Sequence, residues 1–179
     1  LNCMEHRGGC GGDSDSGDGA GILCSIPWGY LEEEINLKNN QEFNRGLGMV
    51  FMPNKKEKIE VCKSICDQEA EKLKVNKTSW RKVPVNNEIL GPLAKANAPF
   101  ICQWILYIDK KDHKDVERLL FQLRKRIEKK IRETFKNDVG DCEFYFASLS
   151  SQTVVYKGMV RSEILSEFYQ DLKEESFKV

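Results

Sequence analysis

The chain has 179 residues, 40% of them hydrophobic, which suits one domain of ordinary size or one large piece of a domain. Lys plus Arg and Asp plus Glu both number 28, so the formal net charge is zero and gives no reason to expect a nucleic-acid or membrane partner. No apolar run approaches the roughly 18 residues of a membrane span, and seven scattered cysteines do not suggest a disulfide framework. We expect a reducing compartment, the cytoplasm or the plastid stroma.

The first nine residues, "LNCMEHRGG", have the pattern of the last turn of a helix. Leu1 and Met4 are three residues apart, and His6 and Arg7 are cations that suit a helix C-terminus. Gly8 can adopt the left-handed conformation that commonly follows a helix. A chain that begins at the end of a helix is expected to be a piece of a longer one.

Hydrophobic periodicity predicts the remaining elements. In chain order these are a strand at 22–26, a short helix at 30–36, a buried strand at 46–53, a helix at 56–73, an edge strand at 80–86, an irregular segment with one helical turn at 88–99, a strand at 100–108, a long helix at 115–135, strands at 142–150 and 152–158, and a last helix capped by Ser162. Pro84 places the strand at 80–86 on an edge, because proline cannot donate to a ladder. Helices and strands do not alternate regularly, so the expected class is an α/β (α+β) sandwich.

A stretch rich in glycine and aspartate, "GGCGGDSDSGDGAG", precedes the first strand. It is not a dinucleotide fingerprint, because Gly17, Gly19 and Gly21 give G-x-G-x-G and a strand follows them. It is not an EF-hand either, because the sixth and twelfth positions counted from Asp13 hold an aspartate and Cys24. A disordered linker is disfavoured by the strand-like sequence that follows directly. A compact, turn-rich connection remains.

Other candidate sites have simpler interpretations as ordinary structure. Cys62 and Cys66 are one helical turn apart, and both histidines are remote in sequence, so core cysteines are favoured over a metal site. His113 is interpreted as a solvated residue. Residues 114–136 carry nine Lys/Arg and four Asp/Glu, which we interpret as the wet face of an amphipathic helix. We therefore expect no metal, no nucleic acid and no membrane partner.

Four ordered motifs resemble the glutaminase domain of glutamate synthases. They are "MEHRGGCGGDSDSGDGAGIL", "GLGMVFMP", "SWRKVPVNNEILGPLAKANAP" and "FYFASLSSQTVVYKGMVRSEILSEFYQDL". The "MEHRGG" and "GDGAGIL" variants lean toward the ferredoxin-dependent type. The resemblance implies an N-terminal-nucleophile hydrolase-like αββα fold, with two antiparallel sheets between helical layers, incomplete in this chain.

In that family an N-terminal cysteine, with its own α-amine as base, hydrolyses L-glutamine. The ammonia is channelled to 2-oxoglutarate, which is converted to L-glutamate at a site with FMN and an iron–sulfur cluster, and reduced ferredoxin is the favoured electron donor. The resemblance therefore implies that glutamine and the remaining domains of the same polypeptide are the partners of this chain. It implies no cofactor in this segment.

The resemblance also implies that residues 1–179 are a partial glutamine amidotransferase type 2 domain. The family's nucleophile lies upstream of Leu1, and its carboxylate-binding arginine and oxyanion-hole motifs lie beyond Val179. We therefore expect this chain alone to be inactive and only marginally folded. The alternative is a non-catalytic binding module that retains the scaffold.

The site residues implied by the resemblance are few. Glu5 and Arg7 are expected near the glutaminase site or in its coupling to the next domain, although Arg7 would equally well satisfy carbonyls at a helix end. The structural loop is expected to depend on Gly8, Gly9, Asp18, Gly19 and Gly21.

Overall fold

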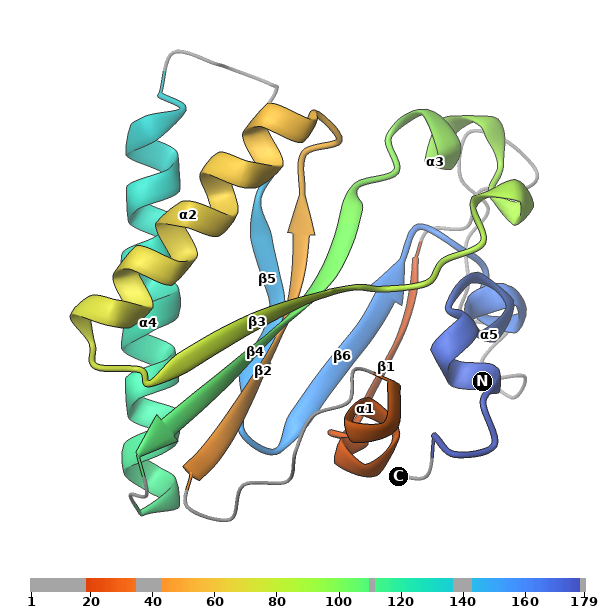
Figure 1. Ribbon diagram of the computed structural model, residues 1–179. Coiled ribbons are helices and arrows are strands. Elements are labelled where there is room, and N and C mark those ends of the chain that lie inside the picture. The colour runs from red at the N-terminus through yellow and green to blue at the C-terminus, as the bar shows by residue number, and fades with distance from the viewer. Residues whose placement is uncertain (1–18, 35–42, 110–111, 137–142, 178–179) are drawn as a thin grey trace.

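The structure is a computed structural model, which describes residues 19–34, 43–109, 112–136 and 143–177 (Figure 1). Its strands are β1 (Ala20–Ser25), β2 (Phe43–Met52), β3 (Lys77–Lys82), β4 (Phe100–Asp109), β5 (Tyr145–Ser150) and β6 (Thr153–Gly158). The α-helices are α1 (Trp28–Glu34), α2 (Lys56–Lys72), α3 (Pro92–Ala96), α4 (His113–Thr134) and α5 (Leu165–Phe168). Three 3-10 helices, η2 (Asn87–Ile89), η3 (Ser162–Ile164) and η4 (Gln170–Lys173), complete the described elements.

The strands form two antiparallel sheets. The larger one has the order β3-β4-β2-β5, and the smaller one pairs β1 with β6. The chain leaves the larger sheet at Ser150 and enters the smaller one at Thr153, so two strands that are neighbours in sequence belong to different sheets. Two antiparallel sheets combined with helices confirm the predicted α+β sandwich.

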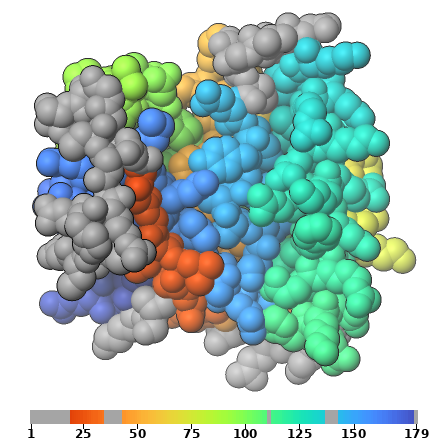
Figure 2. Space-filling model, turned by 180° about the vertical axis from the view of Figure 1, so that it is seen from behind, coloured from red at the N-terminus to blue at the C-terminus, as the bar shows by residue number. Residues whose placement is uncertain are grey.

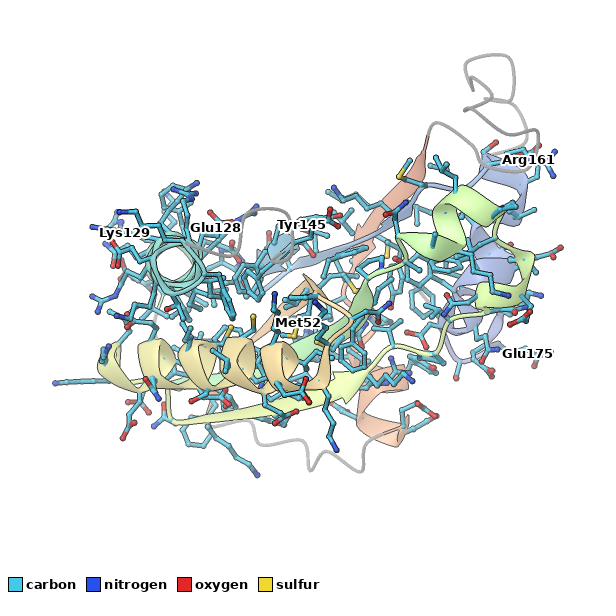
Figure 3. The ribbon with its side chains drawn as sticks, turned by 90° about the horizontal axis from the view of Figure 1, so that it is seen from above. Met52, Glu128, Lys129, Tyr145, Arg161 and Glu175 are labelled. Carbon is cyan, nitrogen blue, oxygen red and sulfur yellow. The ribbon has the colours of Figure 1, made fainter. Side chains whose placement is uncertain are left out.

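The central strands β2 and β4 are buried along most of their length, and their side chains alternate between the two faces of the sheet, each of which is covered. In β4, Trp104 and Leu106 point to the face covered by α2 and α4, whereas Ile105 and Tyr107 point to the opposite face. The opposite face is covered by β6, α1, α5 and η4. Figure 3 shows the dense side chains between these layers, with Met52 among them. The larger sheet therefore has a separate hydrophobic core on each side.

Helix α4 covers the sheet with the apolar stripe that the sequence predicts. Val116, Leu120, Leu123, Ile127 and Ile131 are all buried, and the helix packs against both α2 and β5. Its polar face is exposed, as expected for an amphipathic helix. Among the described residues, no helix is long and apolar enough to cross a membrane.

Strand β3 lies at the edge of the larger sheet, which confirms the prediction, but it ends earlier than expected. It stops at Lys82, and Val83 adds one further hydrogen bond from its N–H to the carbonyl of Ile101. Pro84 has no N–H to continue the ladder, and the chain turns toward another partner there.

The prediction of one continuous last helix capped by Ser162 is wrong. The segment is divided into η3, α5 and η4, and Ser162 bonds to the side chain of Glu163 instead of capping a helix. The break falls at Tyr169, whose φ of −92° and ψ of 105° are extended. Tyr169 forms a β-bridge with Val85, so a tertiary contact overrides the local helical propensity.

The helix-side core should depend strongly on Leu120, whose side chain is fully buried and reaches toward Gly46 of β2. We predict that Leu120→Ala lowers the free energy of unfolding by about 2–5 kcal/mol, because it removes buried methyl groups and leaves a cavity. Urea denaturation followed by far-UV circular dichroism measures this loss. The control is Gln122→Ala on the exposed face of the same helix, for which a change within about 0.5 kcal/mol is expected. Equal effects of the two variants would contradict the assigned helix orientation.

Candidate functional site

A cleft of about 560 Å³ opens between the two sheets at the end where β1 begins and β6 ends. The beginning of β1, the residues around α3, β2, β5 and the segment from Lys157 to Phe168 contribute to its walls. Figure 2 shows β1 against β6 on one face of the molecule. Most of the lining is apolar, and the side chains with charge or amide groups are Asn97, Glu143 and Lys157. An apolar cleft with a few polar groups is the usual form of a small-molecule site.

Two of the glycines singled out in the sequence lie on this cleft. Gly19 has φ = +122°, a conformation that L-residues with a side chain rarely adopt. A Cβ at Gly21 would lie 3.0 Å from the Cβ of Lys157 and 3.2 Å from the carbonyl oxygen of Tyr156. Glycine at these positions therefore lets the chain turn into β1 and lets β1 approach β6 closely.

The other residues expected at the site, Glu5, Arg7, Gly8, Gly9 and Asp18, lie outside the described residues. The structure therefore leaves their expected roles as predictions.

Aromatic and cationic side chains form a stack at one side of the cleft. Tyr145 lies parallel to Phe51 with a centroid separation of 4.9 Å, and the Nζ of Lys157 lies 4.7 Å from the centroid of the Tyr145 ring. Burial raises the pKa of Tyr145, and the nearby charge of Glu143 adds to this effect. The phenol is therefore neutral near pH 7, and its ring offers an apolar surface beside one ammonium group.

The wall formed by Phe168 is held by the segment that follows β3. The N–H of Asn86 donates to the carbonyl of Phe168 at 2.9 Å, and the N–H of Gln170 donates to the carbonyl of Pro84 at 3.2 Å. The hydroxyl of Tyr169 donates to the carbonyl of Lys157 at 2.6 Å. The "RKVPVN" motif thus binds the chain directly after α5, and Tyr169 connects that chain to the end of β6. Sequence reasoning missed this role and interpreted the motif only as an edge strand.

The walls of the cleft carry no serine, cysteine or histidine among the described residues. A serine, a histidine and a carboxylate do meet elsewhere: the Oγ of Ser151 lies 3.2 Å from the Nε2 of His113 and donates to the Oε1 of Glu117 at 2.7 Å. In a catalytic triad the carboxylate orients the histidine, whereas Glu117 binds the hydroxyl and the backbone N–H of Ser151. This cluster connects the β5–β6 bend to the beginning of α4. No group of three or more potential metal ligands occurs within the described ranges.

The interpretation of Cys62 and Cys66 as core residues is confirmed. Both are fully buried free thiols in the helix-side core, which also contains Cys102. Burial raises the pKa of Cys66 far above its ordinary value and raises the pKa of Cys102 to about 12. Cys66 and Cys102 are therefore protonated, and weak nucleophiles, across the physiological pH range.

The approach of β1 to β6 at Gly21 provides a test of this part of the site. We predict that Gly21→Ala lowers the stability of the fold by about 1–3 kcal/mol, because the added methyl group would press against the Cβ of Lys157 and the carbonyl oxygen of Tyr156, which the strand holds in place. Thermal denaturation and amide exchange in β1 and β6 measure the effect. Gly29→Ala is the matched control, because nothing lies within 4 Å of its added Cβ and alanine favours the helix. Unchanged exchange in β1 of Gly21→Ala would contradict the packing described here.

Because the thiols are buried, we expect the free energy of unfolding to fall at alkaline pH. A thiol in the unfolded chain loses its proton above pH ~8.5, whereas folded Cys102 keeps its proton up to about pH 12. The contribution of the protonated Cys102 thiol to the free energy of unfolding is therefore complete below pH ~8.5 and is lost as the pH rises toward 12. We predict that each such thiol lowers the unfolding free energy by up to about 1.4 kcal/mol per pH unit above pH ~8.5. Urea denaturation between pH 8 and 10 measures the slope, and Cys102→Ala should flatten it; an unchanged slope would contradict this assignment.

Comparisons with known proteins agree with the motifs. The family described as "Glutamine amidotransferases class-II" matches residues 1–179. The chain is 42% identical over 182 residues to the "Ferredoxin-dependent glutamate synthase, chloroplastic" of Oryza sativa subsp. japonica, and this match covers 99% of the chain and 11% of that protein. It is 41% identical over 181 residues to the "Ferredoxin-dependent glutamate synthase 2" of Synechocystis sp., with the same two coverages. The resemblance indicated by the sequence is thereby confirmed: the chain belongs to the class-II glutamine amidotransferase family.

Proposed function

We propose that this chain forms part of the glutaminase domain of a glutamate synthase. The observation that carries the proposal is the identity of about 40% along nearly the whole chain to glutamate synthases from plants, red algae and a cyanobacterium. The chain spans only about 11% of the length of these relatives, so the activity belongs to the full-length polypeptide. That activity is hydrolysis of the side-chain amide of L-glutamine, with transfer of the ammonia to 2-oxoglutarate to form L-glutamate.

The cleft fits a supporting role in this reaction. In class-II amidotransferases a cysteine thiolate attacks the amide carbon, ammonia leaves, and water then hydrolyses the γ-glutamyl thioester. In our proposal, residues outside 1–179 supply the nucleophile, the carboxylate-binding arginine and the oxyanion donors. The described residues supply the framework beside them: a glycine-lined approach to β1, an aromatic surface at Tyr145 and the ammonium group of Lys157. Glu5 and Arg7 are proposed to lie near the nucleophile or at the contact with the next domain.

The full-length polypeptide is further proposed to use FMN and an iron–sulfur cluster, with reduced ferredoxin as electron donor. The relatives from Oryza sativa and Arabidopsis thaliana are named as ferredoxin-dependent enzymes, which favours ferredoxin over a nicotinamide nucleotide. These groups would act in domains beyond residues 1–179. The same names include the word chloroplastic, so a plastid stroma or the cytoplasm of a prokaryote is the proposed location.

We predict that the full-length polypeptide transfers the amide nitrogen of glutamine to 2-oxoglutarate, and that residues 1–179 alone release no ammonia. Glutamine labelled with ¹⁵N at the amide, incubated with 2-oxoglutarate and reduced ferredoxin, should give labelled glutamate. NADPH in place of ferredoxin tests the electron donor. Removal of the nucleophile and oxyanion donors costs several orders of magnitude in rate, so the 179-residue chain should match a heat-treated control. A full-length protein that binds glutamine and does not hydrolyse it would favour the non-catalytic module.

A further inference from the structure

A buried arginine joins four elements of the fold on the cleft side of the larger sheet. Arg81 lies on β3, and its side chain is only 4% exposed. Its Nη1 donates to Gln103 on β4 at 3.0 Å and to the Oδ2 of Asp171 in η4 at 2.9 Å. Its Nη2 donates to the Oδ1 of Asp171 at 2.8 Å, and to Tyr30 and Glu34 of α1 at 3.0 and 2.9 Å. The guanidinium thus has a bidentate carboxylate partner and three further acceptors.

Asp171 is the second centre of this network. Its side chain is fully buried, and besides Arg81 it accepts hydrogen bonds from the hydroxyls of Tyr30 at 2.9 Å and Tyr156 at 3.2 Å. The hydroxyl of Tyr156 also accepts a bond from the Nε2 of Gln103 at 3.0 Å, which closes the ring of contacts back to β4. Each polar group of the ring therefore has a partner in the ring, and the network fixes the relative positions of α1, β3, β4, β6 and η4.

The protonation states of these groups agree with their hydrogen bonds. Burial opposes the charge of Arg81, but its contacts with Asp171 outweigh burial and hold its pKa above the ordinary value. Burial and the negative charge of Asp171 raise the pKa values of Tyr30 and Tyr156. Both phenols are therefore donors at neutral pH, and the carboxylate receives donors from three different elements.

The network holds both ends of one wall of the cleft. Tyr156 directly precedes the residues of β6 and its loop, from Lys157 to Val160, that line the cleft. Asp171 follows the cleft residue Phe168 by three positions. Figure 1 shows β6, α1 and α5 on the same side of the larger sheet. The residues of this wall thus lie between Tyr156 and Asp171, and both of these residues belong to the hydrogen-bond network of Arg81.

We propose that Arg81 is a positioning residue for glutamine binding, which acts through Asp171 and Tyr156 to fix the wall of the cleft from Lys157 to Phe168. This inference rests on the proposed glutaminase function. Only the planar fork of a guanidinium binds a carboxylate with two parallel bonds and also reaches two acceptors on α1. Lysine keeps the positive charge but cannot form the same set of hydrogen bonds. Arg81→Lys therefore tests the geometry of these contacts without changing the charge.

The experiment compares three variants in the full-length polypeptide. For Arg81→Lys we expect a folded protein whose KM for glutamine rises at least about tenfold, while glutamate formation from external ammonium is unchanged. Arg81→Met combined with Asp171→Leu replaces the ion pair by apolar groups, which commonly preserves folding. For this double variant we expect a folded protein with the same raised KM. Arg126→Lys is the matched control, because Arg126 pairs with Glu69 at 2.8 Å in the helix-side layer, and no change in KM is expected.

Two outcomes would overturn the proposal. One is an unchanged KM for glutamine in the folded fraction of both Arg81 variants, which would show that the network contributes to stability alone. The other is an equal rise of KM in Arg126→Lys, which would show a general response to loss of an arginine.

Hydrogen exchange distinguishes failure of this inference from failure of the proposed function. If the wild-type polypeptide has no glutaminase activity, the proposed function fails, and the positioning role is still measured by amide exchange. Arg81→Lys should then speed exchange from Lys157 to Phe168 several-fold more than in α4. Equal acceleration of both segments would contradict the positioning role.

Discussion

The position of the Arg81 guanidinium is the constraint on which the cleft side of the molecule depends. An uncompensated charge in the protein interior costs several kcal/mol, and removing one partner of a buried ion pair leaves the other charge without compensation. Each element that packs around Arg81 must therefore bring an acceptor to a fixed place. Helix α1 brings Tyr30 and Glu34, β4 brings Gln103, and η4 brings Asp171. Apolar packing alone would leave these elements free to slide by a residue, whereas the directional bonds do not.

On the helix-covered face of the sheet, a different set of hydrogen bonds fixes the positions of the packed elements. Its core is almost entirely apolar, but Asp67 of α2 accepts hydrogen bonds from the indole N–H groups of Trp80 and Trp104 and from the hydroxyl of Thr78. The two indoles stack with a centroid separation of 5.3 Å. One carboxylate thereby sets the register of α2 against β3 and β4. Each face of the sheet thus has an acidic residue that orients its neighbours by directional hydrogen bonds, Asp67 on the helix side and Asp171 on the cleft side.

The sequence predicted the elements whose burial repeats regularly, and failed where distant contacts decide the conformation. Strands β2 and β4 and helices α2 and α4 followed from hydrophobic periodicity, because each has a continuous apolar face. The last helix was predicted wrongly because the extended conformation of Tyr169 depends on its bridge to Val85, a partner more than eighty residues away. The beginning of β3 was missed because its first residues, from Lys77 to Ser79, are polar and have little apolar alternation.

The buried charges beside the cleft were not predicted, and the reason lies in the usual behaviour of charged residues. Glycines near β1 were expected to shape a turn, and Gly19 and Gly21 lie where a side chain would be strained or crowded. Arg81 and Asp171 were not expected to be buried, because such residues are mostly exposed in folded proteins. One signal was present: alternation along residues 80–86 placed Arg81 on the same face as Val83, and Val83 is fully buried. A charged residue on the same face of a strand as a buried valine indicates that another part of the chain supplies a polar partner.

The "WRKVPVN" motif shows how these constraints combine in seven residues. Its tryptophan belongs to the helix-side core, its arginine to the network behind the cleft, and its exposed lysine faces solvent. Pro84 ends the ladder with β4, and its carbonyl accepts from Gln170 instead. Asn86 donates its N–H to Phe168, and its side chain accepts from the N–H of Glu88 to begin η2. Arg81 binds Asp171 and Asn86 binds Phe168, which lie three positions apart in the segment that ends the wall, so the number of residues between Arg81 and Asn86 is fixed by geometry. The motif therefore acts as a connection of set length between the sheet and the cleft.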